Sequence, residues 1–167
     1  MSARKSVLIS GLLSALLLLA ADQITKSFAL KYLAGTPGIA VIPGVFELFY
    51  LENRGAAFGM FANRQWFFIG IALVMAVVAV YVYLKAPQEK HYTFLRFVCI
   101  LIAAGAVGNM LDRLIFHYVI DFLYFSLIDF PVFNIADCYV CIGAALAVIS
   151  LFTLYKEDSF AFLKLHG

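Results

Sequence analysis

The sequence predicts an all-α polytopic membrane protein with four transmembrane helices, a small extracytoplasmic β-sheet that forms a cradle, and a short surface helix. Of its 167 residues, 65% are hydrophobic and 13% are charged, whereas a typical soluble domain has about 25% charged residues. Four long apolar runs alternate with polar stretches, and one of these stretches is rich in turn and strand signals. A soluble chain of this size could not bury so much apolar surface, which excludes a soluble enzyme. Its high hydrophobicity also excludes a disordered chain.

The first predicted span covers residues 7–29. Its apolar run follows Arg4 and Lys5 and includes small residues near its end, so a cleavable signal peptide is an alternative interpretation. We favour a span, because the periodic pattern continues to Leu30 and further long apolar runs follow.

The insert at residues 30–65 differs in composition from the spans. It contains the turn pairs Pro37-Gly38 and Pro43-Gly44, with short β-prone runs beside them. This pattern predicts a small extramembrane sheet. Residues 55–64 then have the composition of a segment that lies on the membrane surface. Because glycines there can serve as hinges, we hypothesise that this segment is a lid.

The other three spans are predicted at residues 66–84, 94–114 and 132–155, and the whole chain, 1–167, forms a single membrane-embedded domain. Four spans place both termini on one side. That side carries seven Lys and Arg residues and the other side carries five, so the positive-inside rule favours cytoplasmic termini. The net charge of +2 is too small to indicate a nucleic-acid partner.

Four acidic residues fall at the same ends of the predicted spans. A charge at the centre of a span costs about 2.5–3.5 kcal/mol on insertion scales, and this chain places its acids at span ends. Antiparallel geometry gathers Asp22, Asp112, Asp121 and Asp137 into one layer at the outer face.

Two of these acids indicate a catalytic function. Asp121 and Asp137 lie in apolar surroundings, and Asp121 has no cation within a helical turn. Two carboxyl groups that meet in a partly desolvated site share a proton. One can then act as general base on a water while the other acts as general acid, which is aspartyl-protease chemistry. The pair titrates as a unit, so neither residue is assigned a separate role.

The other polar residues of this layer have structural interpretations. Asp22 and Lys26 are four residues apart and can form an ion pair. Asp112 lies beside Arg113 and is also interpreted as structural. Asn134 is either the N-cap of the fourth span or a residue of the site.

The sequence contains little evidence for a metal site, a redox site, a transporter or an assembly subunit. The histidines do not cluster, so no metal site and no cofactor is predicted. Cys138 and Cys141 have redox spacing but fall inside a span, where such pairs pack. A four-span proton-coupled transporter would also explain membrane acids, but it predicts acids near the midplane and short loops. A non-enzymatic assembly subunit would leave Asp121 and Asp137 unexplained.

Five short motifs occur along the chain: Asp22-Gln23-x-Thr25-Lys26, Asn53-Arg54-Gly55-Ala56-Ala57-Phe58-Gly59, Gly108-Asn109-x-x-Asp112-Arg113, Val119-Ile120-Asp121-Phe122 and Phe133-Asn134-x-Ala136-Asp137. These motifs resemble those of the lipoprotein signal peptidase (signal peptidase II) family. They occur in the family's order and in matching positions relative to the four spans, over nearly the whole chain. One residue departs from the pattern: Cys138 stands where a small residue, often Ser or Thr, is expected.

The resemblance implies an aspartyl endopeptidase of the bacterial inner membrane, with its active site at the periplasmic face. Its substrates would be diacylglyceryl-modified prolipoproteins, cut on the amino side of the lipidated cysteine within membrane lipid. Asp121 and Asp137 match the catalytic pair, and one pair per chain makes a monomer sufficient. The positions that match substrate-binding or supporting residues are Asn53, Arg54, Gly55, Asn109, Arg113 and Asn134; those with a mainly structural role are Asp22, Lys26 and Asp112.

Overall fold

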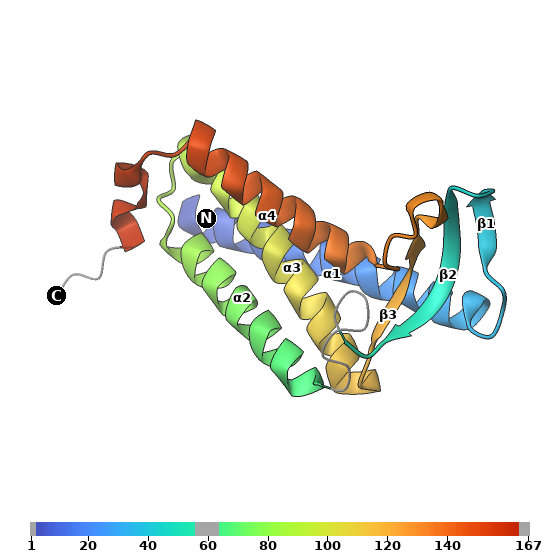
Figure 1. Ribbon diagram of the computed structural model, residues 1–167. Coiled ribbons are helices and arrows are strands. Elements are labelled where there is room, and N and C mark those ends of the chain that lie inside the picture. Colours follow the sequence, from blue (N-terminus) through green and yellow to red (C-terminus); the bar gives the residue numbers. More distant parts are fainter. Residues whose placement is uncertain (1–2, 56–63, 164–167) are drawn as a thin grey trace.

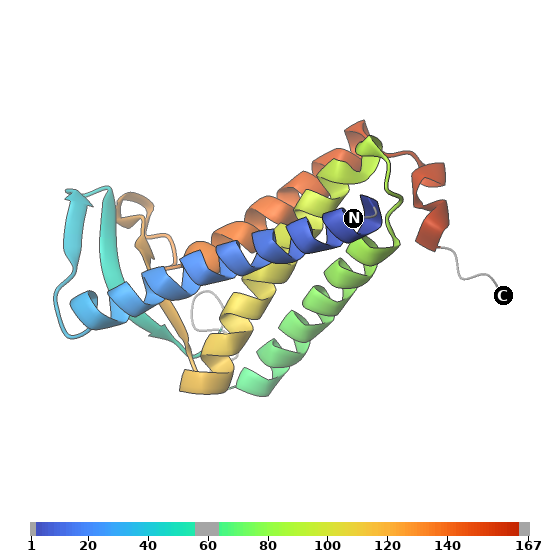
Figure 2. The ribbon, with the colours of Figure 1, turned by 180° about the vertical axis from the view of Figure 1, so that it is seen from behind.

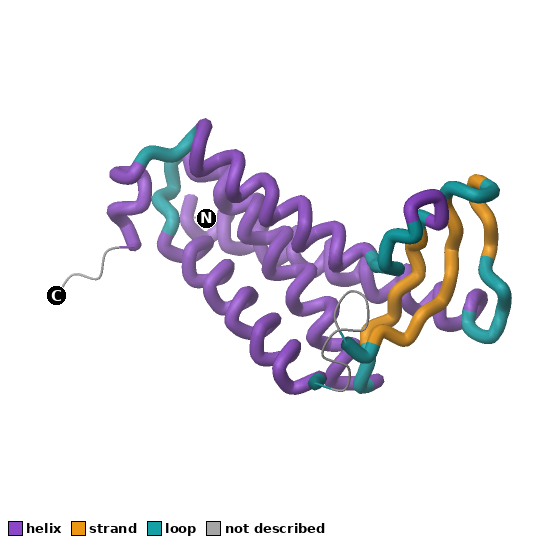
Figure 3. The backbone as a smooth tube through the Cα atoms, viewed as in Figure 1, coloured by secondary structure: helices purple, strands orange, loops and turns teal. Residues whose placement is uncertain are grey.

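A computed structural model of the protein describes residues 3–55 and 64–163. Figure 1 shows a bundle of four helices with a small sheet at one end, and Figure 3 separates the two parts by secondary structure. The helices are α1 (Ala3–Leu33), α2 (Gln65–Lys85), α3 (Thr93–Phe116) and α4 (Ile135–Thr153), the strands are β1 (Ile39–Ile42), β2 (Phe46–Asn53) and β3 (Val119–Tyr124), and short 3-10 helices are η2 (Lys90–Tyr92), η3 (Ser126–Ile128) and η4 (Glu157–Leu163).

The four predicted spans are confirmed as helices. Within the described residues, four helices are long and apolar enough to cross a membrane. The first extends beyond its predicted bounds at both ends. The fourth begins three residues later than predicted, because Asn134 has extended backbone angles and caps the helix.

The sheet packs against the C-terminal end of α1, which extends beyond the helix bundle. With 31 residues, α1 is about 46 Å long at 1.5 Å per residue, which exceeds a hydrocarbon core of about 30 Å. Its last turns bury Ala29 and Leu33 against Ile120 and Phe122 of the sheet. Figure 2, the view from behind, shows α1 running along the bundle to the sheet. The same helix therefore crosses the membrane and supports the extramembrane layer.

The third strand of the sheet is a finding that we did not predict. The sheet is antiparallel with the order β1-β2-β3, whereas the sequence predicted a sheet within residues 30–65 alone. β2 is eight residues long and would leave a long open edge, which β3 covers. The register places Asp121 opposite Leu51 and Val119 opposite Asn53. The pairing thus brings Asn53, which belongs to the insert at residues 30–65, beside Asp121.

Helix α3 lies at the centre of the bundle, with α2 and α4 on either side of it (Figure 1). Small residues allow α4 and α1 to come close to α3. A Cβ built on Gly105 would meet the carbonyl of Ala136, and one built on Gly108 would lie 2.6 Å from a carboxylate oxygen of Asp22. The glycines of α3 therefore form close-packed contacts with α4 and α1.

We expect Gly108→Ala to destabilise the protein by about 1–3 kcal/mol, because the added methyl group displaces the carboxylate of Asp22. The matched control is Gly70→Ala in α2, where an added Cβ has no neighbour within 4 Å. Thermal unfolding in detergent measures both variants. An unchanged melting temperature for Gly108→Ala would show that Asp22 can move without cost.

The predicted surface segment, 55–64, falls largely outside the described residues. Gly55 and Arg64 are described, whereas 56–63 are not. The surface helix and the lid function of this segment stay predictions.

Candidate active site

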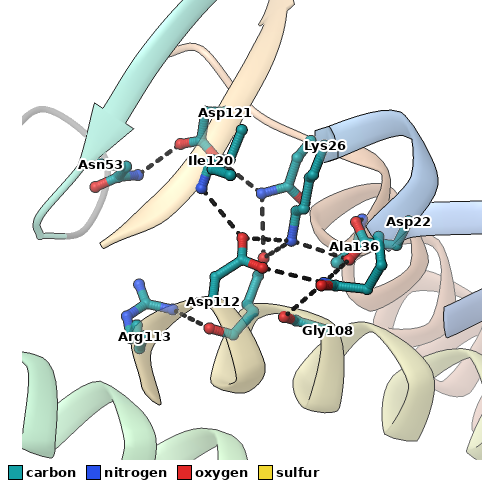
Figure 4. Close-up of polar contacts among 12 residues, drawn as sticks. Asp22, Lys26, Asn53, Gly108, Asp112, Arg113, Ile120, Asp121 and Ala136 are labelled. Carbon is teal, nitrogen blue, oxygen red and sulfur yellow. Dashed lines mark hydrogen bonds and ion pairs between the residues drawn. The ribbon is translucent and has the colours of Figure 1, made fainter. Parts of the chain in front are cut away.

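Asp121 projects from the middle of β3 into the space between the sheet and the helix bundle (Figure 4). Its side chain is fully buried and both of its carboxylate oxygens accept hydrogen bonds. The amide nitrogen of Asn53, at the end of β2, donates to Oδ2 at 2.8 Å. That of Asn134 donates to Oδ1 at 2.6 Å. Two residues from different elements therefore fix the orientation of this carboxyl group.

Asp137 lies in the first turn of α4 and takes part in a capping box with Asn134. The backbone N–H of Asp137 donates to Oδ1 of Asn134 at 3.0 Å, and the backbone N–H of Asn134 donates to Oδ2 of Asp137 at 3.1 Å. Asn134 is thus the N-cap of α4 and also a hydrogen-bond donor to Asp121. The N-cap interpretation of Asn134 is confirmed, and its hydrogen bonds link the two carboxyl groups. Its role as a residue of the site stays a prediction.

Asn109 connects Asp137 to the interior of the bundle. Its amide nitrogen donates to Oδ1 of Asp137 at 2.7 Å. Its amide oxygen accepts from Asn134 at 3.1 Å and from the ammonium group of Lys26 at 2.9 Å. Because the oxygen is occupied by two donors, the amide cannot rotate, and its nitrogen stays directed at Asp137.

The environment raises the pKa of Asp121 to about 7 from the ordinary value of 3.8. The main cause is burial, which disfavours the charged form, and the nearby carboxyl group of Asp137 adds to it. The hydrogen bonds from Asn53 and Asn134 act in the opposite direction because they stabilise the carboxylate. Asp121 therefore exchanges its proton near neutral pH, where a shared proton is useful for catalysis.

A buried ion network lies directly beneath this pair. The ammonium group of Lys26 is 2.9 Å from a carboxylate oxygen of Asp22 and 3.0 Å from one of Asp112. All three side chains are essentially inaccessible to solvent. Figure 4 shows these contacts joining α1 to α3. The predicted pair of Asp22 and Lys26 is confirmed, but Asp112 pairs with Lys26 rather than with its neighbour Arg113.

Each carboxylate of this network also holds the backbone beside one member of the pair. Asp112 accepts from the backbone N–H of Ile120 at 3.1 Å, next to Asp121. Asp22 accepts from the backbone N–H of Ala136 at 2.9 Å, next to Asp137. The network therefore fixes the separation of β3 and α4, and with it the relative positions of the two carboxyl groups.

Gln23 completes the network and was not among the predicted site residues. Its amide nitrogen lies 3.1 Å from Asp22 Oδ2, 3.0 Å from Asp112 Oδ1 and 3.3 Å from the carbonyl of Gly108. The signal in the sequence is its position beside Asp22 in the first motif. Gln23 was missed because the site residues were predicted from the positions of charged side chains, and its amide is neutral although it contacts two carboxylates.

Of the other predicted site residues, Arg113 and Gly55 lie together and Arg54 lies apart. The guanidinium group of Arg113 donates to the carbonyl of Gly55 at 3.3 Å and lies over the ring of Phe68. Gly55 in turn donates its N–H to Oδ1 of Asn53 at 3.0 Å. Arg54 instead forms an ion pair with Glu52, with 53% of its side chain exposed. The structure does not bring Arg54 to the two carboxyl groups.

A cavity of about 180 Å³ opens beside Asp137 between α2, α3 and α4. Asn109, Arg113 and Asp137 provide its polar wall, and apolar residues of α2, among them Ile71 and Met75, provide the opposite wall. A polypeptide bound in this cavity would face polar side chains of the protein on one side and apolar side chains on the other. We refer to it below as the catalytic cavity.

The described part of the chain contains no cluster of metal-binding side chains and no disulfide bond. Within residues 3–55 and 64–163, no group of three or more His, Cys, Asp or Glu side chains could hold a metal ion. Cys99, Cys138 and Cys141 are free thiols.

The chain is similar to known proteins in sequence and in fold. The sequence model of a family described as signal peptidase (SPase) II matches residues 14–153. Lipoprotein signal peptidases of Streptococcus pyogenes serotypes M6 and M5 are each 37% identical to this chain over 148 residues, which cover 89% of this chain and 94% of theirs. A bacterial membrane enzyme structure obtained by the in meso method at 2.3 Å resolution superposes with a TM-score of 0.78 and 31% identity, covering 89% of this chain and 92% of that one.

Proposed function

Because this chain belongs to the signal peptidase II family, whose members are aspartic peptidases that cleave the signal peptides of prolipoproteins, we propose that Asp121 and Asp137 are the carboxyl groups that perform this cleavage. One observation carries the assignment. Asp121 from β3 is fully buried and Asp137 from α4 is partly buried. Both bind Asn134, through its side chain and its backbone N–H respectively. Two carboxyl groups placed in this way can act on one water and one peptide bond.

In the proposed mechanism the pair carries one proton. The ionised carboxylate removes a proton from a water, and the oxygen of that water attacks the carbonyl carbon of the scissile bond. The protonated carboxyl donates its proton to the carbonyl oxygen. The resulting tetrahedral diol then collapses: a carboxylate accepts a hydroxyl proton, the carbonyl re-forms, and the C–N bond breaks as its nitrogen receives a proton from the pair. The pair returns to its single-proton state, so no metal or cofactor enters the reaction.

The amide partners explain how the pair is held ready for this reaction. All four carboxylate oxygens accept a hydrogen bond, from Asn53, Asn109, or the side chain or backbone of Asn134. These donors fix the carboxyl groups before the substrate arrives, so little reorganisation is needed during the reaction. Burial keeps one proton on the pair near neutral pH.

The proposed substrate carries a diacylglyceryl group on the cysteine that follows the cleaved bond. The site lies where the helix bundle meets the sheet (Figure 1). In a membrane, this junction is at the boundary of the hydrocarbon. A lipid-bearing cysteine is held at the same boundary by its acyl chains. Cleavage on the amino side of that cysteine therefore needs no movement of the lipid into water.

The proposed orientation places both termini in the cytoplasm and the sheet at the periplasmic face of the inner membrane. The protein is a multi-pass membrane protein with four spans. Its N-terminal residues and η4 lie at the end of the bundle opposite the sheet (Figure 1), and basic residues are more frequent at that end. A single chain contains a complete pair, so we propose that the monomer is active. The transporter alternative is set aside because the family is a peptidase family.

The direct test measures cleavage of two substrates by the purified protein. One is a diacylglyceryl-modified prolipoprotein, and the other is the same precursor without the lipid. We expect cleavage of the modified precursor alone, at the bond before the cysteine, as read by mass spectrometry of the products. Equal cleavage of both precursors would refute lipid-dependent recognition, and a different cleaved bond would refute the proposed register.

Removing the hydrogen bond from Asn53 should shift the pH dependence of cleavage. That bond lowers the pKa of Asp121, so Asn53→Ala raises it further above 7. A hydrogen bond to the charged carboxylate is stronger than one to the neutral carboxyl group by about 1 kcal/mol, which corresponds to roughly 0.7 pH unit. The alkaline limb of the rate profile, where the pair loses its proton, should therefore move to higher pH by up to about one unit.

The control for this prediction is Arg54→Ala, because Arg54 pairs with Glu52 at the surface. It should leave the position of the alkaline limb unchanged. Both variants should lose less activity than substitutions of the catalytic pair. A limb that stays in place for Asn53→Ala would show that Asn53 does not tune Asp121.

A further inference from the structure

We propose that η4 (Glu157–Leu163) is the inner stop of a groove that holds the apolar segment of the signal peptide, and that it limits the length of that segment. This inference rests on the proposed function, since it takes the scissile bond to lie at Asp121 and Asp137. It concerns the end of the bundle that is remote from the catalytic pair, and it assigns a role to a segment that the reaction itself does not use.

The first observation is a second cavity in line with the catalytic cavity. It has a volume of about 430 Å³ and is formed by α2, α3, α4 and η4. Met75 of α2 lines both cavities. α2 and α4 pack mainly on α3, on either side of it. Together the two cavities form a groove with α3 as its floor and with α2 and α4 as its walls, which we call the α2–α4 groove.

The second observation is the chemistry of the groove away from the catalytic pair. The inner cavity is lined almost entirely by apolar side chains, such as Val78 and Val82 of α2 and Ile102 of α3. Val74 and Val78 have 62% and 54% of their surface uncovered by the rest of the chain. An apolar helix is the ligand that fits such a lining in a membrane. A bacterial signal peptide supplies one, covalently joined to the scissile bond on its amino side.

The third observation is that η4 closes the groove. Phe160 and Leu163 of η4 line the inner cavity. The segment is held firmly: the hydroxyl of Tyr92 donates to the carbonyl of Ser159 at 2.9 Å, and Phe160 packs edge-on against Tyr155. The contacts tie η4 to η2, just before α3, and to the segment that follows α4. The apolar side chains of η4 therefore form a fixed wall.

The length of the groove matches that of a signal peptide. Asp137 in the catalytic cavity and Ser150 in the inner cavity are about 13 residues apart along α4, which is about 20 Å. A substrate helix laid along α4 would therefore fit about 13 residues between the scissile bond and η4. The apolar region of a signal peptide has about 7–15 residues. Longer regions would collide with Phe160 and Leu163.

The test measures kcat/KM for lipid-modified precursors whose apolar regions have about 10, 13, 16 and 19 residues. For the unmodified enzyme we expect at least a tenfold fall between 13 and 19 residues. Phe160→Ala combined with Leu163→Ala should remove most of this fall, with little change for the 13-residue substrate. Phe160→Trp should strengthen it. Phe152→Ala is the matched control, because Phe152 of α4 is 86% exposed and does not line the groove.

The outcomes separate this inference from the proposed function. If the 13-residue substrate is cleaved by the unmodified enzyme and not by Asp121→Asn, the proposed function holds. Once that result is obtained, the length dependence decides the inference. If it is the same in the Phe160 and Leu163 variants as in Phe152→Ala, the inference is overturned, and the inner cavity is then a site for membrane lipid. Should the double alanine variant unfold, Phe160→Trp still tests it, because an unchanged length dependence in that variant would also overturn it.

Discussion

Asp121→Asn and Asp137→Asn are each expected to reduce cleavage of a lipid-modified precursor by about 10³-fold or more, because each removes one half of an acid–base pair. An asparagine can neither accept the proton of the water nor donate a proton to the carbonyl. Both variants keep the size of the side chain, and a buried carboxyl group is replaced by a neutral amide, so we expect folded protein in each case.

The control is Asp129→Asn in the segment between β3 and α4. Asp129 is exposed and accepts a hydrogen bond from the hydroxyl of Tyr124. It should retain cleavage close to that of the unmodified enzyme. Near-normal cleavage by either Asp121→Asn or Asp137→Asn would show that the assigned pair is wrong.

Lys26→Met is expected to give the largest loss of stability. Its ammonium group is the shared cation of Asp22 and Asp112, and all three side chains are buried. Removing one partner of a buried ion pair costs about 3–5 kcal/mol, since it leaves an uncompensated charge. That is a large part of the usual stability of a protein, about 5–15 kcal/mol. We therefore expect a much lower melting temperature in detergent and a loss of cleavage.

Two further variants make the Lys26 prediction specific. Lys31→Met removes an exposed cation from the same helix and should change the melting temperature little. Neutralising Asp22 and Asp112 to Asn together with Lys26→Met removes the unpaired charges and should recover part of the stability. If the triple variant melts no higher than Lys26→Met, the loss arises from packing rather than charge.

The sequence predicted the parts of the fold that follow from local pattern. The spans were found because apolar runs of about 20 residues have few other uses. Pro37-Gly38 and Pro43-Gly44 marked the first two strands. β3 was missed because its residues pair with a segment about seventy positions earlier in the chain. Such long-range pairing leaves no periodic signal in a run of six residues.

The site was predicted in its members but not in its connections. The positions of acids at span ends indicated Asp121 and Asp137, and the resemblance supplied the amides around them. The sequence could not show that Asp112 accepts from Ile120 or that Asp22 accepts from Ala136, because these bonds join side chains to the backbone of distant elements. Nor could it show that Arg54 turns toward Glu52.

The central claim is that Asp121 and Asp137 act as one unit with a shared proton. Carbon-13 NMR of protein labelled at aspartate carboxyl carbons tests it most directly, with Asp121→Asn identifying the signal of Asp121. We expect Asp121 to titrate with a pKa of about 7. In Asp137→Asn the pKa should fall, because the neighbouring carboxyl group helps to raise it. A pKa near 3.8 that does not respond to Asp137→Asn would contradict the claim.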